Sequence, residues 1–271
     1  MQHLKIGVTE RGDAALDFSW YDKCMAAAQG KRGLNGALVI TKNLSEKVQE
    51  KLLDLHAQGF PIIVHATCTG WGKDPTMEPG VPACETQIQQ LADLIKKGFP
   101  ADHTVLRVDP VFPSDAGLDR FKKVLDLHQA TFPNVRVRMS VYDEYPHVRD
   151  RLLSRNLRPL YNGRFYSPTT MMAQVLKVMQ EYPQITFETC AEPYLNGPNI
   201  LHLGCLSNKD LAIMGLPEWE GTLNGQNRSG CLCCACKAEL LTGPKKPCGH
   251  GCIYCFWRTP EEDAKRRQSK A

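Results

Sequence analysis

The chain has 271 residues, a formal net charge of +4, and a composition that is 42% hydrophobic and 23% charged. Such a length can bury a core without disulfide bonds, and no apolar run reaches the length of a membrane span, which excludes an integral membrane protein. The small charge, much of it in the run from Lys265 to Lys270, argues against a dedicated nucleic-acid-binding module. The start of the chain lacks a signal-peptide pattern, so we expect a cytoplasmic protein with no membrane partner.

Short β-branched runs alternate with segments of helical periodicity up to about residue 210, which is typical of repeated strand and helix units around a parallel sheet. We predict an α/β fold: a partial (β/α) barrel, TIM-like, with six or seven parallel strands, over residues 1–215. The expected strands are 5–9, 37–41, 61–66, 104–108, 136–141, 185–189 and 200–203. The expected helices are 45–58, 84–97, 115–132, 147–156 and 167–181.

Residues 216–271 lose this periodicity and are predicted to form an irregular, cysteine-rich iron–sulfur segment that closes the mouth of the barrel. Seven of the twelve cysteines lie between Cys231 and Cys255, a density that favours metal over disulfides in a reducing compartment. Cys248, Cys252 and Cys255 have C-x3-C-x2-C spacing, which suits three ligands of a 4Fe-4S cluster. The fourth iron would then stay open for a substrate or cofactor.

The remaining cysteines allow a second metal. Cys231, Cys233 and Cys236 could hold zinc or an auxiliary iron–sulfur cluster, with a fourth ligand from Cys190 or Cys205. Two alternatives stay open. Cys190 and Cys205 could be ordinary buried core residues. The pairs Cys233-x2-Cys236 and Cys252-x2-Cys255, 15 residues apart, also meet the spacing of a four-cysteine zinc site.

Polar residues follow the predicted strands, and the carboxyl ends of parallel strands meet at one edge, where sites are built. We therefore expect these side chains to ring a single mouth. The candidates are Arg11, Asp13, Lys42, Asn43, Arg107, Asp109, Asp143 and Glu192.

Almost the whole chain resembles the family called domain of unknown function 1848, whose members end in a cysteine cluster similar to that of radical S-adenosylmethionine enzymes. The resemblance rests on 11–13, 41–43, 69–71, 78–82, 107–110, Ser140 with Asp143 and Tyr145, 190–192, 227–228, 231–233 and 248–256. Two departures are Cys236, where the family has a serine, and an apparent insertion around 243–246.

These patterns lead to the hypothesis of a radical S-adenosylmethionine enzyme, which would reductively cleave S-adenosylmethionine and abstract hydrogen from an unidentified substrate, including a nucleotide or nucleic acid. A reductase, flavodoxin or ferredoxin would donate the electron. Lys42 or Arg107 would face the methionine carboxylate and Asp109 or Glu192 its amino group. Those four are the catalytic candidates; the cofactor-binding candidates are Tyr254, Arg11, Asp13 and Asn43.

Radical enzymes usually carry a Gly-Gly-Glu strand shortly after the three cysteines, but only 16 residues follow Cys255. That strand must therefore come from elsewhere in a permuted arrangement or be missing, in which case the cluster would bind something other than S-adenosylmethionine. The alternative hypothesis is a zinc-stapled barrel in which the metal is structural and the polar ring binds an anionic small molecule.

Overall fold

The computed structural model describes residues 4–223, 230–241 and 248–257. Eight parallel strands form one sheet in the order β7-β6-β5-β4-β3-β2-β1-β8. Each of β1 to β6 therefore pairs with its successor in the chain and β8 pairs with β1, which is the arrangement of a (β/α) barrel that stays open between β7 and β8.

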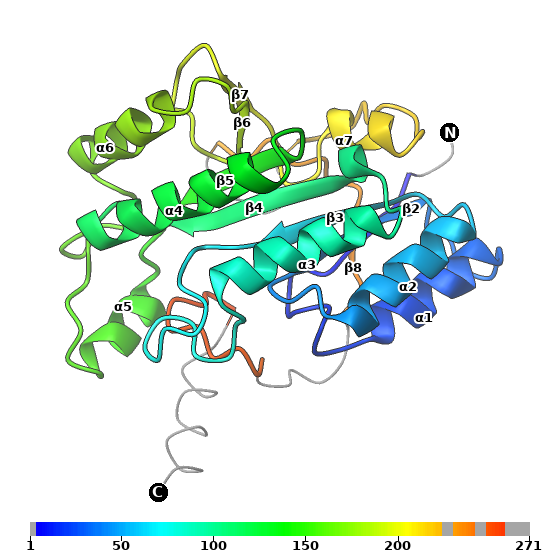
Figure 1. Cartoon of the computed structure of the whole chain (residues 1–271), viewed down its shortest axis with the longest axis horizontal. Helices are drawn as coiled ribbons and strands as arrows, with labels where there is room; N and C mark the ends of the chain where they lie inside the picture. Colours follow the sequence, from blue (N-terminus) through cyan, green and yellow to red (C-terminus); the bar gives the residue numbers. More distant parts are fainter. Residues whose placement is uncertain (1–3, 224–229, 242–247, 258–271) are drawn as a thin grey trace, which may run out of the picture.

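The strands are β1 (Ile6–Val8), β2 (Gly36–Thr41), β3 (Ile62–Thr67), β4 (Thr104–Val111), β5 (Arg136–Val141), β6 (Phe187–Thr189), β7 (Ile200–His202) and β8 (Lys237–Glu239). The helices are α1 (Ser19–Ala28), α2 (Glu46–Ala57), α3 (Cys84–Lys96), α4 (Asp115–Thr131), α5 (Pro146–Leu153), α6 (Thr169–Gln180) and α7 (Asn208–Ile213), with a short 3-10 turn at Ala101–His103. Figure 1 shows α1 to α4 side by side along the sheet.

Alternation along the strands divides the buried side chains between two faces of the sheet. In β2, Val39 joins the large core between sheet and helices, whereas Leu38 and Ile40 join a smaller cluster on the other face. The amphipathic helices bury their apolar faces in the large core, as Leu52 and Leu55 of α2 do. Burial on both faces explains why the strands read as continuous apolar runs in the sequence.

The partial barrel is confirmed, and the seven strands expected from the sequence are all present. The eighth, β8, lies in the cysteine-rich segment and pairs with β1 through Lys237, Ala238 and Glu239. Its three residues carry no β-branched or aromatic side chain, so no strand signal marks it. Helix α1 also escaped prediction, because only Trp20 and Cys24 of its residues are buried. No helix in the described part of the chain is long and apolar enough to cross a membrane.

Candidate functional site

A cavity of about 260 Å³ lies at the carboxyl ends of the strands. Residues at or just after the ends of β1 to β7 line it. The C-terminal segment contributes two sets of cysteines, Cys231 with Cys233 and Cys248 with Cys252 and Cys255. The lining includes Thr9, Asp13, Thr41, Lys42, Thr67, Arg107, Asp109, Ser140, Tyr142, Asp143, Cys190, Cys205, Cys231, Cys233, Cys248, Cys252, Tyr254 and Cys255. The structure thus brings most of the polar strand-end residues and the cysteines to one place.

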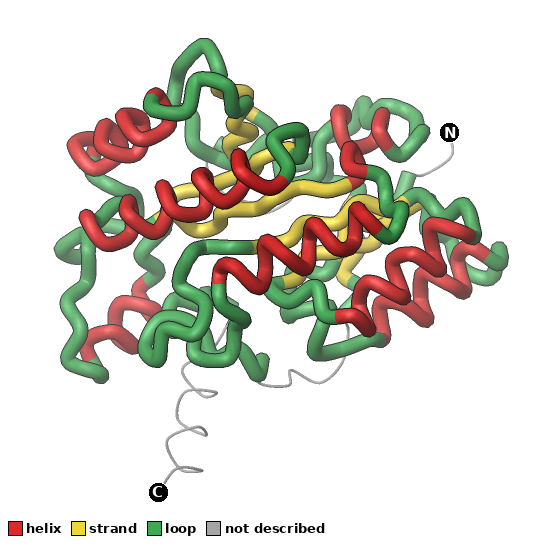
Figure 2. Tube along the Cα trace, in the orientation of Figure 1, coloured by secondary structure: helices red, strands yellow, loops and turns green. Residues whose placement is uncertain are grey.

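The segment 248–257, here called the cysteine loop, packs against the connection that follows β3 and against α5 (Figures 1 and 2). The amide of Gly80 donates to the carbonyl of His250 over 3.0 Å, and the amide of Ile253 donates to the carbonyl of Met77 over 3.1 Å. A Cβ on Gly80 would come within 2.5 Å of the carbonyl oxygen of Gly249, so only glycine permits this approach. Arg151 of α5 donates to the carbonyl of Ile253 over 2.7 Å.

His250 connects the cysteine loop to the β1 side of the barrel. Its Nδ1 lies 3.0 Å from the carbonyl of Gly80, and its Nε2 lies 2.9 Å from Oδ2 of Asp13. Burial opposes both charges, but their mutual attraction prevails: the pKa of His250 is raised and the pKa of Asp13 is lowered. The two groups therefore form a buried ion pair, and Asp13 also accepts from Thr41 Oγ1 over 2.6 Å.

A second buried contact joins the loop to β2 through Glu78. Oε1 of Glu78 accepts from Nζ of Lys42 over 2.7 Å and from the hydroxyl of Tyr254. Lys42 also lies 3.0 Å from the Tyr254 oxygen. Burial lowers the affinity of Lys42 for its proton, but the nearby Glu78 carboxylate outweighs it, so the pKa of Lys42 is raised. Lys42 stays charged and Tyr254 stays a phenol, because burial raises the pKa of Tyr254 well above its usual value.

The three cysteines of the predicted cluster site all face the cavity. Cys252 is buried, whereas Cys248 and Cys255 are partly exposed. Burial raises the pKa of the free Cys252 thiol to about 12, and the charges of Cys255 and Cys248 act in the same direction. The three thiols are thus close enough to influence one another, although their sulfur atoms do not form a group tight enough for a single ion.

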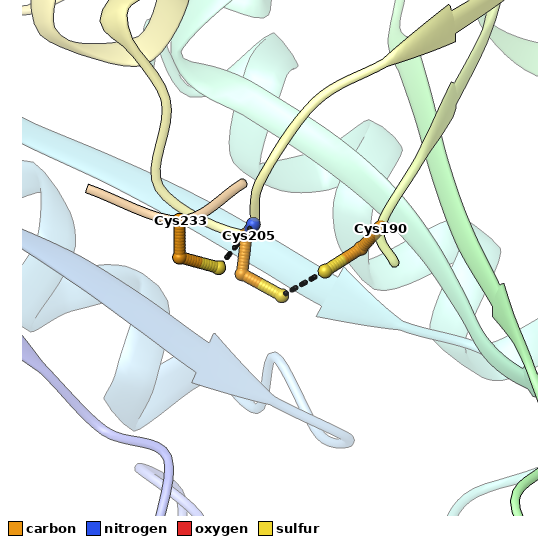
Figure 3. A group of neighbouring side chains, drawn as sticks. All are labelled: Cys190, Cys205 and Cys233. Carbon is orange, nitrogen blue, oxygen red and sulfur yellow. Dashed lines mark hydrogen bonds between the residues drawn. The ribbon is translucent and has the colours of Figure 1, made fainter. Parts of the chain in front are cut away.

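The second cysteine group is tighter. Cys190 follows β6, Cys205 follows β7 and Cys233 precedes β8, and their sulfur atoms all lie within 4.8 Å of one another (Figure 3). Cys231 packs with them in the same buried cluster. The hydrogen bond from Cys233 lowers the pKa of Cys231 to about 6, and hydrogen bonds from Cys190 and Cys205 lower that of Cys233 to about 7. A lowered pKa favours the thiolate, which is the form that binds metals.

Arg107 and Asp109 of β4 form an ion pair at the cavity wall. Ser140 of β5 donates to Asp109, and the guanidinium of Arg107 lies 3.9 Å from the Cys205 sulfur. Burial opposes the charge of Arg107, but the Asp109 carboxylate beside it outweighs burial and raises the pKa of Arg107. The pair presents one positive and one negative group side by side to the cavity.

Four predicted site residues lie elsewhere than the cavity wall. The side-chain oxygen of Asn43 accepts from Gln90 over 2.9 Å, and Glu192 accepts from the amide of Val141 over 2.8 Å. The Arg11 guanidinium stacks 5.1 Å from the centre of the Trp257 ring. Cys236 packs in the apolar cluster with Ile6, Val8 and Leu38 instead of joining the other cysteines.

Neither Glu78 nor Arg151 was predicted as a site residue. Glu78 holds the cysteine loop through the side chain of Tyr254, and Arg151 holds it through the carbonyls of Ile253 and Cys255. Neither follows a strand directly, so the strand-end rule could not find them. The glycine at 80 was the available signal, because a close approach of two backbones needs such a residue. Some parts of the sequence that the prediction used lie outside the described residues. These are Asn227 and Arg228, the insertion around 243–246, and the residues after 257, which include the basic run from Lys265 to Lys270.

Comparisons with known proteins give one family and similar solved structures. The family model "Domain of unknown function (DUF1848)" matches residues 23–257. Among solved structures, the chain is similar to DHDPS from Cyanidioschyzon merolae with lysine bound, at 12% identity and a TM-score of 0.35 over 80% of this chain and 69% of that chain. It is also similar to a "putative beta-galactosidase" from Bacteroides fragilis, at 18% identity and a TM-score of 0.31 over 74% of this chain and 31% of that chain. The comparison with curated proteins gives no match.

Proposed function

Since the chain belongs to the family described as domain of unknown function 1848, its chemistry has to follow from the site itself, and we propose that it is an iron–sulfur enzyme of the radical S-adenosylmethionine type. Cys248, Cys252 and Cys255 would hold a 4Fe-4S cluster with one open iron. The observation that carries the proposal is that these cysteines line the same cavity as the polar strand ends. When bound, the cluster supplies the electron for reductive cleavage of S-adenosylmethionine and so for hydrogen abstraction from a substrate.

The cavity wall fits a polar occupant. Thr67 and Tyr142 line the cavity, and their buried hydroxyl oxygens have no hydrogen-bond partner among the described residues. Such atoms usually find a partner in a ligand or water. Three thiols without a fourth at the cysteine loop also match a cluster that keeps one iron open.

Arg107 and Asp109 are the best candidates to bind the methionine end of the cofactor. A zwitterionic amino acid needs one fixed positive and one fixed negative group side by side. Arg107 would bind the carboxylate and Asp109 the ammonium, because Lys42 is already engaged by Glu78 and Glu192 by a backbone amide. The ring of Tyr254 lines the cavity beside them, with its hydroxyl held by Glu78. Ser140 would keep Asp109 oriented through its hydrogen bond.

The test begins with protein purified without oxygen, followed by measurement of iron, zinc and acid-labile sulfide. Adding dithionite and S-adenosylmethionine should then yield 5′-deoxyadenosine, and Cys252→Ala should abolish that product. A matched control is Cys24→Ala, because Cys24 is buried in the helix core far from the cavity lining. Zinc as the sole metal, or undiminished product from Cys252→Ala, would refute the proposal.

One observation favours the alternative of a barrel with a structural metal that binds an anionic small molecule. Cys190, Cys205 and Cys233 already lie close enough for one ion, without any iron–sulfur cluster. In that case the protein would contain metal but no sulfide, would bind a carboxylated or phosphorylated ligand through Arg107, and would form no 5′-deoxyadenosine.

A further inference from the structure

The barrel is open between β7 and β8, and the second cysteine group lies at this opening. Cys190 and Cys205 come from the β6 and β7 side, and Cys231 and Cys233 from the segment that leads into β8. We propose that these four cysteines bind a single thiophilic divalent ion, Zn²⁺ or Fe²⁺, that joins the two edges of the sheet. This site is separate from the cysteine loop and does not rest on the function proposed for it.

The spacing of the sulfur atoms selects a single ion. Four thiolates placed tetrahedrally about 2.3 Å from one Zn²⁺ lie about 3.8 Å from one another. The sulfur atoms of Cys190 and Cys205 are 3.2 Å apart, and those of Cys190, Cys205 and Cys233 all lie within 4.8 Å. Thiolates that bind different irons of a cluster must lie farther apart, because the irons and sulfides come between them.

Cys231 supplies the fourth ligand. It is two residues from Cys233, belongs to the same buried cluster, and interacts with the Cys233 thiol. It also lines the cavity beside the other three. Cys234 and Cys236, by contrast, pack in the apolar cluster on the other side of the segment. Within this segment, Cys231 and Cys233 therefore lie on the side of the proposed ion, and Cys234 and Cys236 lie on the side of the core.

The surroundings suit a thiolate site. The amide of Cys205 donates to the Cys233 sulfur over 3.1 Å, and the Arg107 guanidinium lies 3.9 Å from the Cys205 sulfur. Arg138 holds the Cys205 backbone by donating to its carbonyl over 2.7 Å. Donors of this kind orient metal ligands and offset the negative charge of a tetrathiolate centre.

The backbones at the opening approach closely around the same residues. A Cβ on Gly204 would lie 2.4 Å from the Cys233 Cα, so glycine is required there. The amide of Cys234 donates to the carbonyl of Leu206 over 2.9 Å. Among the described residues, no ladder of strand hydrogen bonds joins β7 to β8. An ion bound to ligands from both sides would close the opening as such a ladder closes a full barrel.

The experiment uses the full chain with Cys248, Cys252 and Cys255 all changed to alanine, so that any metal left belongs to the second group. Purified without oxygen, this protein should contain one zinc or one iron per chain and no labile sulfide. X-ray absorption at that metal should show four sulfur ligands. In the same background Cys205→Ser and Cys233→Ser should lose the metal, whereas Cys236→Ala should keep it. A strong chelator should remove the ion and lower the melting temperature.

Four results would overturn the inference: no metal in a folded protein, several irons with labile sulfide, a disulfide between Cys190 and Cys205 in non-reducing mass spectrometry, or loss of the metal in Cys236→Ala. X-ray absorption is measured on the protein in which only Cys248, Cys252 and Cys255 are changed. The number of sulfur ligands can therefore be determined even if a serine variant fails to fold. A failure of the proposed function can be told apart from a failure of this inference. It would appear as the absence of 5′-deoxyadenosine in the unaltered chain, whatever Cys190, Cys205, Cys231 and Cys233 bind.

Discussion

His250 Nε2 lies 2.9 Å from Asp13 Oδ2, so a histidine between Cys248 and Cys252 is joined to the connection that follows β1. Both side chains are buried, at 3% and 5% exposure. The contact joins the last described segment of the chain to the first strand unit, and it makes the position of the cysteine loop depend on the barrel.

Asp13→Asn should loosen the cysteine loop, because it removes the negative charge that faces His250. A hydrogen bond to a charged group contributes about 1.5–3 kcal/mol. Amide exchange in peptides from 248–257 should therefore become about 10 to 150 times faster. Hydrogen–deuterium exchange with mass detection measures this directly. Asp22→Asn, in the exposed face of α1, is the matched control. Unchanged exchange in Asp13→Asn would mean that the other contacts of the loop, with Gly80, Met77, Glu78 and Arg151, hold it without this pair.

Glu78→Gln should cost far more stability than the same change at a surface ion pair. Glu78 is fully buried beside Lys42, whose side chain is 16% exposed. Removing one partner of a buried pair leaves the other charge uncompensated and costs about 3–5 kcal/mol. In Glu46→Gln the loss should stay below about 1 kcal/mol, because Glu46 is 81% exposed and 3.9 Å from Lys97. Denaturant unfolding at matched metal content compares the two, and equal losses would contradict a stabilising role for the Lys42–Glu78 pair.

The strand positions and the location of the cavity could be predicted because both depend on local pattern. Val39 and Val64 lie in buried β-branched runs, and Asp13, Lys42 and Arg107 follow or end strands that meet at one edge. Which side chain pairs with which could not be predicted. The contacts of Asp13 with His250 and of Lys42 with Glu78 join segments far apart in the sequence, and periodicity carries no information on them.

The cysteines show the same limit. The C-x3-C-x2-C spacing placed Cys248, Cys252 and Cys255 in one group from local sequence alone. Cys236 was grouped with Cys231 and Cys233 because C-x2-C is a common ligand spacing, but it packs against Ile6 and Val8. The prediction did not use the alternation of side chains along an extended segment. In a segment that enters a strand, side chains two residues apart tend to face the same way, which separates Cys231 and Cys233 from Cys234 and Cys236.

Asp210→Asn should lower stability at neutral pH and flatten its dependence on acid. Asp210 is buried between Arg138 and Arg136, at 3.0 and 2.8 Å. Burial raises its pKa, but the two guanidinium charges outweigh this and hold the pKa well below the usual 3.8. The folded pKa is below the unfolded one, so the contribution is full above about pH 4 and is lost as pH falls further.

The difference in unfolding free energy between the natural chain and Asp210→Asn should therefore be about 3–5 kcal/mol at pH 7 and shrink toward pH 2. Denaturant unfolding at a series of pH values measures it. Asp102→Asn, at an exposed position in the turn before β4, should give a curve parallel to that of the natural chain. A difference for Asp210→Asn that stays constant with pH would contradict the charged pairing.

Arg107→Gln should weaken S-adenosylmethionine binding by more than tenfold while leaving the fold intact. The change removes the positive partner of Asp109 and leaves a carboxylate facing the cavity, where it would repel the methionine carboxylate. Losing a charge-assisted hydrogen bond costs about 1.5–3 kcal/mol, or roughly 10 to 150-fold in affinity. Equilibrium dialysis without oxygen measures the affinity, and iron content checks that the cluster is still present. Arg164→Gln, at an exposed position after α5, controls for the loss of one positive charge. If both variants bind the cofactor as the natural chain does, Arg107 does not contact it and the carboxylate must be bound by another group.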